Sequence, residues 1–454
     1  MIFTEVENCI VGLGPAGMGS AMRFANSRMA KETLCVELGG GAADRWCSIL
    51  KGKACRKAEP CEILSGVGGA SLLSGGKISE YPAGRSLGDY LDGDANTKKA
   101  LEDALHSWSE YVPLSTTLYS DNVIERGRKY YTDQGFEFNY YKALQCRRND
   151  LVLGYGKMMD LLRSTGINVN LHSAVQSLEQ LQGGFEVNTL DRNGQNLIRC
   201  KNLIIAIGRS GSNLLSSMNK QMHLGGSDRR IEVGVRFEFP VSLWPDIDAC
   251  HVDLKLLHSD ARTFCVCKNG MITPYRLMDF FLLEGHSEPG MSTGFTNFGI
   301  SIRLDDLAPG QAAIIFNHVR STITAQSGGR PIRQMLPDYL LEKQTNVKSH
   351  SPSSINYWQW GNMGSLYPQD ISTRLLNEVE FFCNRLFPAD RLSEISVFGP
   401  VMDYFWQQYP KRSSFESVVP GIYMVGDCTG QFRGILQSYC SGIQATNRIL
   451  GIRE

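Results

Sequence analysis

The amino-acid sequence predicts an α/β protein, in which a parallel sheet with covering helices is combined with a second α+β domain. Three observations indicate this arrangement. An apolar run, a glycine-rich turn and a helical stripe follow one another over residues 6–25. Alternating short strands precede an apolar strand over residues 167–211, and a further strand–glycine–helix succession covers residues 420–448. We expect these three segments to build one discontinuous domain.

The first segment predicts a dinucleotide site. After the apolar run, Gly12, Gly14 and Gly17 follow in G-x-G-x-x-G spacing. Gly12 would allow the tight turn, Gly14 would leave room for a pyrophosphate, and Gly17 would let the helix pack closely on the sheet. Pro15 suits the first helical turn, whose free amides would face the phosphates. A second strand ends on Glu37, where a carboxylate would bond the adenosine ribose and repel a 2′-phosphate.

The C-terminal segment indicates which dinucleotide is bound. Ile422–Val425 predict a strand, Gly426 and Asp427 follow, and a glycine-containing turn then enters a helix that runs almost to the last residue. This succession resembles the element that closes the FAD site in flavoproteins of the glutathione-reductase type. The resemblance implies that Asp427 bonds the ribitol chain and that the helix directs its positive end at the flavin pyrimidine ring.

The middle segment resembles the small β-meander and return strand of the same flavoproteins. Asn193-Gly194 predicts a hairpin turn, and the apolar strand Leu203–Ile207 ends in Gly208. The resemblance puts Val175, on the loop after the first strand of this segment, beside the adenine. We therefore expect a Rossmann-like FAD-binding domain of the glutathione-reductase type, with a parallel sheet plus a β-meander, and FAD as its cofactor.

The remaining residues predict a second, discontinuous α+β domain for the substrate. Residues 1–94, 150–211 and 396–454 are assigned to the FAD-binding domain, and residues 95–149 and 212–395 to the substrate or cap domain. The second of these cap segments alternates apolar and polar residues in its first half, which favours strands, and has helical periodicity later.

A second glycine-rich stretch, GVGGASLLSGGKISEYP over residues 66–82, is not a phosphate loop. It lacks the G-x-x-x-x-G-K-[ST] order, because Lys77 is followed by isoleucine. Its glycines would let bare backbone pass close to the ribitol and isoalloxazine. Together with RTFCVCKNGMI, SGGRPIRQMLPDYL and YMVGDCTGQFRGILQSYCSGIQA, the stretch resembles a poorly characterised family of FAD-dependent dehydrogenases, or NAD(P)/FAD-dependent oxidoreductases.

This resemblance runs through nearly the whole chain and implies the two-domain fold and bound FAD, but no substrate. The family carries G-x-GGAG-x-x-S-DGK and a T-F-C-x-C segment. Here Ser71 replaces the third glycine, and Gly76 replaces the acid before the lysine. We therefore expect the charge of Lys77 to be less paired in this chain than in the family.

Lys77 and Arg433 are the candidate catalytic residues. The ammonium of Lys77 could stabilise reduced flavin or polarise a substrate carbonyl, and the alternative is a solvated or phosphate-paired lysine. Arg433, at the turn entering the last helix, could bind an anionic substrate, contact the ribitol or lie on the surface. The predicted FAD-binding residues are Gly12, Gly14, Pro15, Ala16, Gly17, Glu37, Leu38, Gly68, Gly69, Ala70, Ser71, Gly76, Lys77, Val175, Ala206, Gly208, Gly426, Asp427, Gly434 and Ile435.

These features predict an FAD-dependent oxidoreductase that transfers hydride between a small organic substrate or a nicotinamide and flavin N5. There is no second G-x-G-x-x-G, so NADH or NADPH would visit only transiently as an electron donor. Two alternatives stay open. One is a flavin-dependent monooxygenase or a halogenase-like biosynthetic enzyme, for which the W-x-W of Trp358 and Trp360 is a weak sign. The other is a non-catalytic flavin-binding redox or assembly protein.

The cysteines predict neither a metal site nor a redox disulfide. Cys47, Cys55 and Cys61 contain no C-x-x-C pair, so they make a weak metal or iron–sulfur motif and we assign no metal. Cys265 and Cys267 alternate along a predicted strand, so we expect them to face opposite sides and to pair poorly.

Composition limits the partners. Lysine plus arginine equals aspartate plus glutamate at 46 each, which disfavours nucleic acid and favours a small-molecule ligand. No apolar run approaches the ~18 residues of a membrane span, and the acidic, strand-like start does not resemble a secretory signal. An odd count of 13 scattered cysteines indicates a reducing compartment, so we expect a cytoplasmic protein. The oligomeric state is not predicted.

Overall fold

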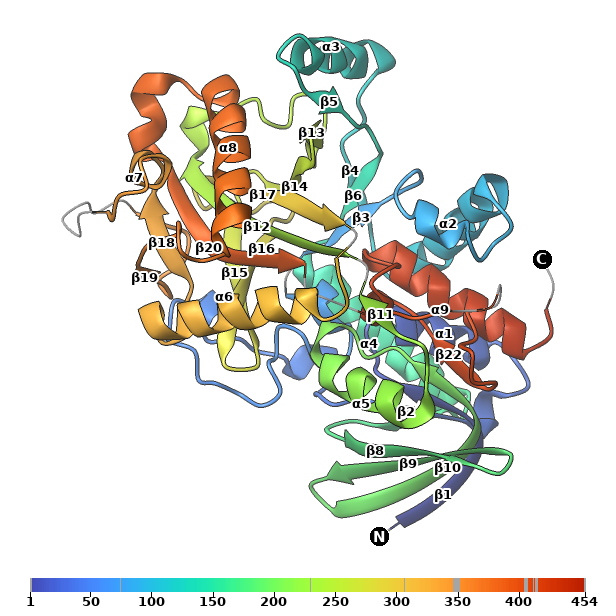
Figure 1. Cartoon of the computed structure of the whole chain (residues 1–454). Helices are drawn as coiled ribbons and strands as arrows, with labels where there is room; N and C mark the ends of the chain where they lie inside the picture. Colours follow the sequence, from blue (N-terminus) through green and yellow to red (C-terminus); the bar gives the residue numbers. More distant parts are fainter. Residues whose placement is uncertain are drawn as a thin grey trace.

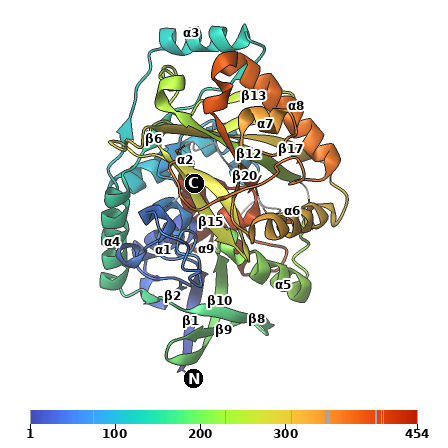
Figure 2. The ribbon, with the colours of Figure 1, turned by 90° about the vertical axis from the view of Figure 1, so that its left-hand side faces the viewer.

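Two large sheets organise the protein (Figure 1). The computed structural model describes residues 2–73, 75–228, 230–305, 307–345, 352–403, 407–410, 412 and 415–452. The first sheet has seven strands in the described residues and holds the N-terminus, and the second has eight and lies above it in Figure 1. Figure 2 shows the β8–β9 hairpin beside the N-terminus at one end of the molecule and α3 at the other.

The first sheet is parallel at its centre and antiparallel at one side. The strands, in spatial order, are β7 (Asn168–Asn170), β2 (Thr33–Val36), β1 (Ile2–Val11), β10 (Gly194–Ile205), β9 (Gly184–Asp191) and β8 (Ala174–Leu181), with β22 (Ile422–Met424) also paired to β10. The predicted Rossmann-like core and its β-meander are therefore present as one sheet.

Strand β10 differs from the expectation of a separate return strand beginning at Leu203. It is continuous from Gly194. Its first half pairs antiparallel with β9, and from Asn196 to Ile205 it pairs in parallel with β1. The reason is its burial pattern, because residues alternate between exposed and buried near the hairpin and become fully buried towards Ile205. One strand thus belongs to both the meander and the parallel core.

Helices at the two ends of the sequence lie together on the first sheet. The helix α1 (Pro15–Ala25) packs against α9 (Ile435–Ile449), where the Ser20 hydroxyl donates to the Gly442 carbonyl at 3.0 Å. The helices α4 (Arg148–Ser164) and α2 (Asp94–Ser109) extend this layer. Contrary to its assignment to the cap domain, α2 packs on α9, with the rings of Trp108 and Tyr439 5.2 Å apart.

The second sheet is mostly antiparallel. Its strands, in spatial order, are β19 (Gln359–Trp360), β18 (Ile332–Met335), β20 (Ser396–Asp403), β12 (Arg230–Pro240), β17 (Phe295–Asp305), β14 (Ala261–Cys267), β13 (Leu256–His258) and β5 (Glu137–Phe138). Helices α8 (Gln369–Leu386) and α6 (Gln311–Ser327) accompany it, as expected from the helical periodicity. The predicted boundary at residue 396 fails here, because β20 is buried and pairs with β12 from Ser396 to Asp403.

Short elements complete the described fold. They are the hairpin β15 (Met271–Leu277) and β16 (Phe280–His286), the three-stranded group β3 (Lys77–Ser79), β6 (Ala143–Gln145) and β4 (Ser115–Thr116), the pair β11 (Ser227–Asp228) and β21 (Gln407–Gln408), and the helices α3 (Asp121–Thr132), α5 (Ser212–Met222) and α7 (Leu336–Leu340). In the described ranges, no helix is both long and apolar enough to cross a membrane.

Candidate active site

A cavity of about 640 Å³ opens where the carboxyl ends of the parallel strands face the second sheet. Of the predicted cofactor residues, all but Gly17, Gly68 and Gly426 line it. Those three lie behind its wall. The amide of Gly68 donates to the Leu13 carbonyl at 2.8 Å, and that of Gly426 to the Ser441 hydroxyl at 3.0 Å. The predicted residues are thus brought to one place, and their binding role stays a prediction.

Two helix N-termini meet at this cavity. Gly12 has φ +97°, and a Cβ on it would stand 2.4 Å from the Ala206 carbonyl oxygen, so only glycine fits this turn. The turn leads through the N-cap Gly14 into α1. At the other end of the chain, the N-cap Gly434 leads into α9. Both caps line the cavity, so the free amides and positive ends of two helices favour an anionic or electron-rich ligand.

Glu37 holds the loops around the cavity together. It is buried, and its carboxylate accepts hydrogen bonds from the amides of Leu13 at 2.6 Å, Gly39 at 2.8 Å and Gly66 at 2.8 Å. These bonds join the phosphate-loop turn to the second glycine-rich stretch. A carboxylate has about four acceptor positions, so one is left for the predicted ribose contact.

Several buried polar atoms of the cavity wall have no hydrogen-bond partner in the described part of the chain. They include the hydroxyls of Ser65 and Ser173 and the Oδ1 atom of Asp427. Ser65 immediately precedes Gly66, and the amide of Ser173 donates to the carbonyl of Glu37, so both serines lie at the Glu37 end. Unpaired buried polar atoms are costly, and a polar ligand in the cavity would satisfy them.

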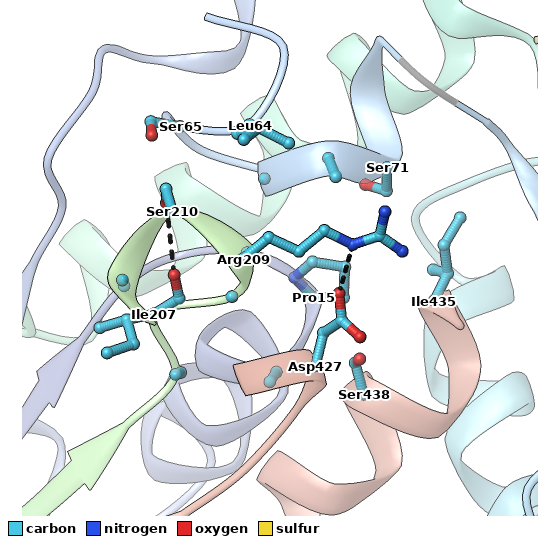
Figure 3. A pocket seen from close by; sticks show the side chains of 18 of the residues that line it. Pro15, Leu64, Ser65, Ser71, Ile207, Arg209, Ser210, Asp427, Ile435 and Ser438 are labelled. Carbon is cyan, nitrogen blue, oxygen red and sulfur yellow. Dashed lines mark hydrogen bonds and ion pairs between the residues drawn. The ribbon is translucent and has the colours of Figure 1, made fainter. Parts of the chain in front are cut away.

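Arg209 crosses the cavity from the turn after β10 (Figure 3). Its guanidinium donates to Asp427 at 2.9 Å, to Glu284 at 2.6 Å and to the hydroxyl of Tyr275 at 3.0 Å. Burial alone would lower the pKa of Arg209, but Tyr275 and the carboxylates of Asp427 and Glu284 outweigh burial and raise the pKa well above its ordinary value. Sequence reasoning missed Arg209, although it directly follows the predicted Gly208.

Arg433 lies at the same wall, where it forms an ion pair with Asp403 of β20. Its guanidinium is therefore already neutralised from the second sheet. The predicted role in binding an anionic substrate is not tested by this pairing.

The surroundings of Lys77 contradict the expectation that its charge is less paired in this chain. Its ammonium forms an ion pair with Asp253 at 3.2 Å and donates to the carbonyl of Val266. Burial alone would lower the pKa of Lys77, but Asp253 and the nearby thiols raise it above its ordinary value. Burial alone would raise the pKa of Asp253, but Lys77 lowers it to about 2. The acid missing at Gly76 is thus replaced by one 176 residues further along the chain.

Two other predicted residues differ in their surroundings. Val175 lies within β8 rather than on a loop, at a register shift where the strand bends, and it still lines the cavity. Ser71, which departs from the family glycine, donates to the Gly68 carbonyl at 2.6 Å and bonds the Tyr155 hydroxyl at 2.8 Å. Its hydroxyl therefore anchors the glycine-rich stretch to α4.

The W-x-W pair lies away from the cavity. Trp358 and Trp360 contact each other with ring centres 4.9 Å apart and cover the Arg333 guanidinium at 4.7 and 5.1 Å. Neither lines the cavity. Both rings instead pack on the Arg333 guanidinium in cation–π contacts.

The expectation that Cys265 and Cys267 face opposite sides is wrong. Cys265 has φ +49°, and the pairing of β14 with β17 shifts register between Phe264 and Cys267. This bulge cancels the expected alternation, and the two thiols lie on the same side with sulfurs 3.9 Å apart. All thirteen cysteines are unbonded, and no group of three or more metal-ligating side chains occurs among the described residues.

Comparison with known proteins finds weak structural similarities. No protein-family model matches the sequence, and no curated protein does. Solved structures that resemble the chain include the anhydrotetracycline hydroxylase OxyS from Streptomyces rimosus, with 13% identity, a TM-score of 0.39 and coverage of 99% of this chain and 63% of that one.

Two others are a flavoprotein/dehydrogenase from Cytophaga hutchinsonii (11% identity, TM-score 0.41, 99% of this chain and 80% of that one) and glycine oxidase from Geobacillus kaustophilus (12%, 0.39, 99% and 96%). The chain thus spans less than two thirds of the hydroxylase. The case for a function rests on the cavity.

Proposed function

We propose that the protein is an FAD-dependent oxidoreductase that acts on a small organic substrate or a nicotinamide. The observation that carries the proposal is the set of unpartnered polar atoms in one cavity between two helix N-termini. Ser65 and Ser173 lie at its Glu37 end, and Asp427 lies near the N-terminus of α9. A dinucleotide has a ribose, a pyrophosphate and a polar ring system in this order, and FAD adds a ribitol chain for Asp427.

The residues present suit this cofactor. The amides at the start of α1 would hold the pyrophosphate, and the remaining acceptor position of Glu37 would hold a ribose hydroxyl. The start of α9 would face the pyrimidine edge of the ring, where negative charge develops on reduction. A bound flavin would supply hydride acceptance at N5 and onward electron transfer.

The side of the cavity opposite the helix starts would supply the substrate side of the site. Lys77 of β3, Asp253, Cys265 of β14 and Glu284 of β16 line it, and Arg209 reaches it from the turn after β10. The Lys77–Asp253 pair would hold its ammonium in the charged form near a reacting carbonyl, and the buried walls would exclude water. A transient visit by NADH or NADPH needs no second dinucleotide motif.

A non-catalytic flavin-binding protein is the second candidate. It is favoured by one observation: both candidate catalytic cations are already paired, Lys77 with Asp253 and Arg433 with Asp403. A halogenase-like activity is not supported by the W-x-W residues, since they pack on Arg333.

The test is a visible spectrum of the purified protein, with added FAD if it is colourless, followed by anaerobic addition of NADH, NADPH and candidate substrates. The proposal expects bound flavin that at least one donor bleaches. Failure to take up FAD would contradict both candidates. Bound flavin that no donor bleaches would favour the binding protein.

A further inference from the structure

Two cysteines lie side by side where the second sheet borders the cavity. The bulge in β14 turns Cys265 and Cys267 to the same side, with sulfurs 3.9 Å apart. Cys265 is half-buried and lines the cavity, while Cys267 is fully buried behind it. One thiol is thus accessible from the cavity, and the other is in contact with the first.

Two buried cations surround the inner sulfur. The Lys77 ammonium is 3.8 Å from Cys267 Sγ. The Arg236 guanidinium is also close to it, because its Nη1 atom and Cys267 Sγ both lie within 3 Å of the point where a Cβ on residue 285 would stand. Residue 285 is glycine, and this convergence requires it. The sulfur is therefore close to both an ammonium and a guanidinium.

Arg236 has no carboxylate of its own. Its side chain is completely buried, and Nη1 donates to Asn297 at 2.6 Å and to the carbonyl of Cys265 at 3.3 Å. Its Nε and Nη2 atoms have no partner among the residues that the structure describes, and no ion pair of Arg236 occurs there. A buried cation without an ion pair is costly. Glu284, whose charge acts on Arg236, forms its ion pair with Arg209, and a thiolate at Cys267 would supply negative charge near Arg236.

We propose that Cys265 and Cys267 form a redox-active dithiol, which exchanges with external disulfides that enter the cavity. The carboxylate of Asp253 neutralises Lys77, and a Cys267 thiolate neutralises Arg236. Thiolates are the attacking species in such exchange, and neighbouring lysine or arginine side chains favour them.

The pKa values agree with this geometry. Burial alone would raise the pKa of Cys267, but the hydrogen bond with Cys265 and the charges of Lys77 and Arg236 lower it to about 6. The pKa of Cys265 is raised by its hydrogen bond to Cys267 and by burial. The pair therefore holds one proton, on Cys265, at neutral pH.

The exchange balances as follows. The Cys267 thiolate takes the proton of Cys265, and the Cys265 sulfur attacks the external disulfide, whose S–S bond breaks to release one thiolate. The released thiolate accepts that proton from Cys267 and leaves as a thiol, and the Cys267 thiolate then attacks the Cys265 sulfur of the mixed disulfide. The Cys265–Cys267 bond forms, a second thiolate leaves, and the two cysteines lose the two electrons that the external disulfide gains.

This activity does not require FAD, so it can fail or succeed independently of the proposed function. The test uses the full-length protein, equilibrated without oxygen in mixtures of glutathione and glutathione disulfide, then quenched in acid and alkylated in denaturant. Trypsin cuts after Arg262 and Lys268, so the peptide of residues 263–268 carries both cysteines and no other.

The expected result is a reversible change of this peptide from doubly alkylated to unalkylated with the loss of two hydrogens. Cys265→Ser and Cys267→Ser each abolish the change, whereas Cys250→Ser, at a buried thiol elsewhere, leaves it intact. Lys77→Met removes a charge that stabilises the reduced state, so the midpoint moves to an about tenfold less oxidising mixture. A peptide that stays doubly alkylated, or a disulfide to another cysteine, would overturn the proposal.

Discussion

The two walls of the cavity are built in opposite ways. The first wall, which belongs to the first sheet, consists of glycine turns, helix starts and two carboxylates, Asp427 and Glu37, and Glu37 is bound by three backbone amides. The second wall, formed by β3, β14, β16 and the segment with Asp253, is dense in side-chain charge. There Lys77 pairs with Asp253, and Glu284 pairs with Arg209, which reaches across from the turn after β10. The first wall offers backbone groups to a ligand, and the second offers ionised side chains.

The difference suggests that one wall is suited to binding a cofactor and the other to reacting with a substrate. Backbone amides are fixed by the fold and suit a cofactor that stays bound. Paired side chains can exchange partners and protons, which suits a substrate that comes and goes. Changes on the first wall should therefore act on cofactor affinity, and changes on the second on stability and reactivity.

The largest effect is expected from Gly14→Val on the first wall. Gly14 has φ −67°, and a Cβ there would meet only the Gly69 Cα atom at 3.7 Å, so the fold tolerates a side chain. The side chain would occupy the space over the start of α1, and we expect FAD affinity to fall about 1,000-fold, or about 4 kcal/mol, by fluorescence titration. Gly156→Ala, in open space on α4, is the control and should bind FAD unchanged.

A smaller effect is expected from Lys77→Met on the second wall. It leaves Asp253 buried without its counter-ion, which should cost about 3 kcal/mol of unfolding free energy in urea titrations. The double variant with Asp253→Asn should recover at least half of that loss. Lys98→Met removes an exposed partner of Glu102 and should cost less than about 0.5 kcal/mol. Equal losses for the two lysines would mean that the buried Lys77–Asp253 pair contributes no more to stability than the exposed Lys98–Glu102 pair.

Acid should lower the free energy of unfolding in two steps, first through His251 and then through Asp253. Burial lowers the pKa of His251 to about 4, so from about pH 6.5 downwards the unfolded chain binds a proton that the folded chain refuses. Asp253, with its pKa near 2, adds a further loss between about pH 4 and 2, because the unfolded carboxylate is protonated first.

We expect about 2 kcal/mol of unfolding free energy to disappear between pH 6.5 and 4. His251→Phe, in a site lined by Phe138, Tyr140 and Tyr141, should flatten that step, while exposed His106→Gln should not. An unchanged profile in His251→Phe would remove His251 from the explanation.

The first wall could be predicted from sequence, because its residues follow strands directly. Gly12 and Glu37 directly follow the neighbouring parallel strands β1 and β2, and Asp427 comes shortly after β22, which pairs with β10. Each position depends on a turn of a few residues, and local spacing fixes such turns. Helical periodicity likewise predicts helices over residues 311–325 and 375–386, and the structure has them over Gln311–Ser327 and Gln369–Leu386.

The second wall could not be predicted, because its contacts join residues that no local pattern relates. Asp253 reaches Lys77 across 176 positions. The bulge at Cys265 reversed an alternation that the sequence predicts, and the pairing of β20 with β12 moved the domain boundary. Strand pairing and bulges depend on tertiary packing, which one strand's residues do not reveal.

The smallest predicted effect concerns Ser173 on the first wall. Its hydroxyl is buried and has no partner in the described part of the protein, so Ser173→Ala removes an unpaired polar group. The protein without cofactor should keep its stability or gain up to about 1 kcal/mol in thermal unfolding. If the hydroxyl meets FAD, affinity should fall about fivefold, or about 1 kcal/mol.

Thr189→Val is the matched control, because the Thr189 hydroxyl is also buried and unpartnered within the described residues but does not line the cavity. It should change stability in the same direction and leave FAD affinity unaltered. Opposite signs for stability and affinity at Ser173, but not at Thr189, would show that the first wall keeps an unpaired hydroxyl for its ligand. Lost stability at Ser173 with unchanged affinity would instead mean that the hydroxyl serves the fold.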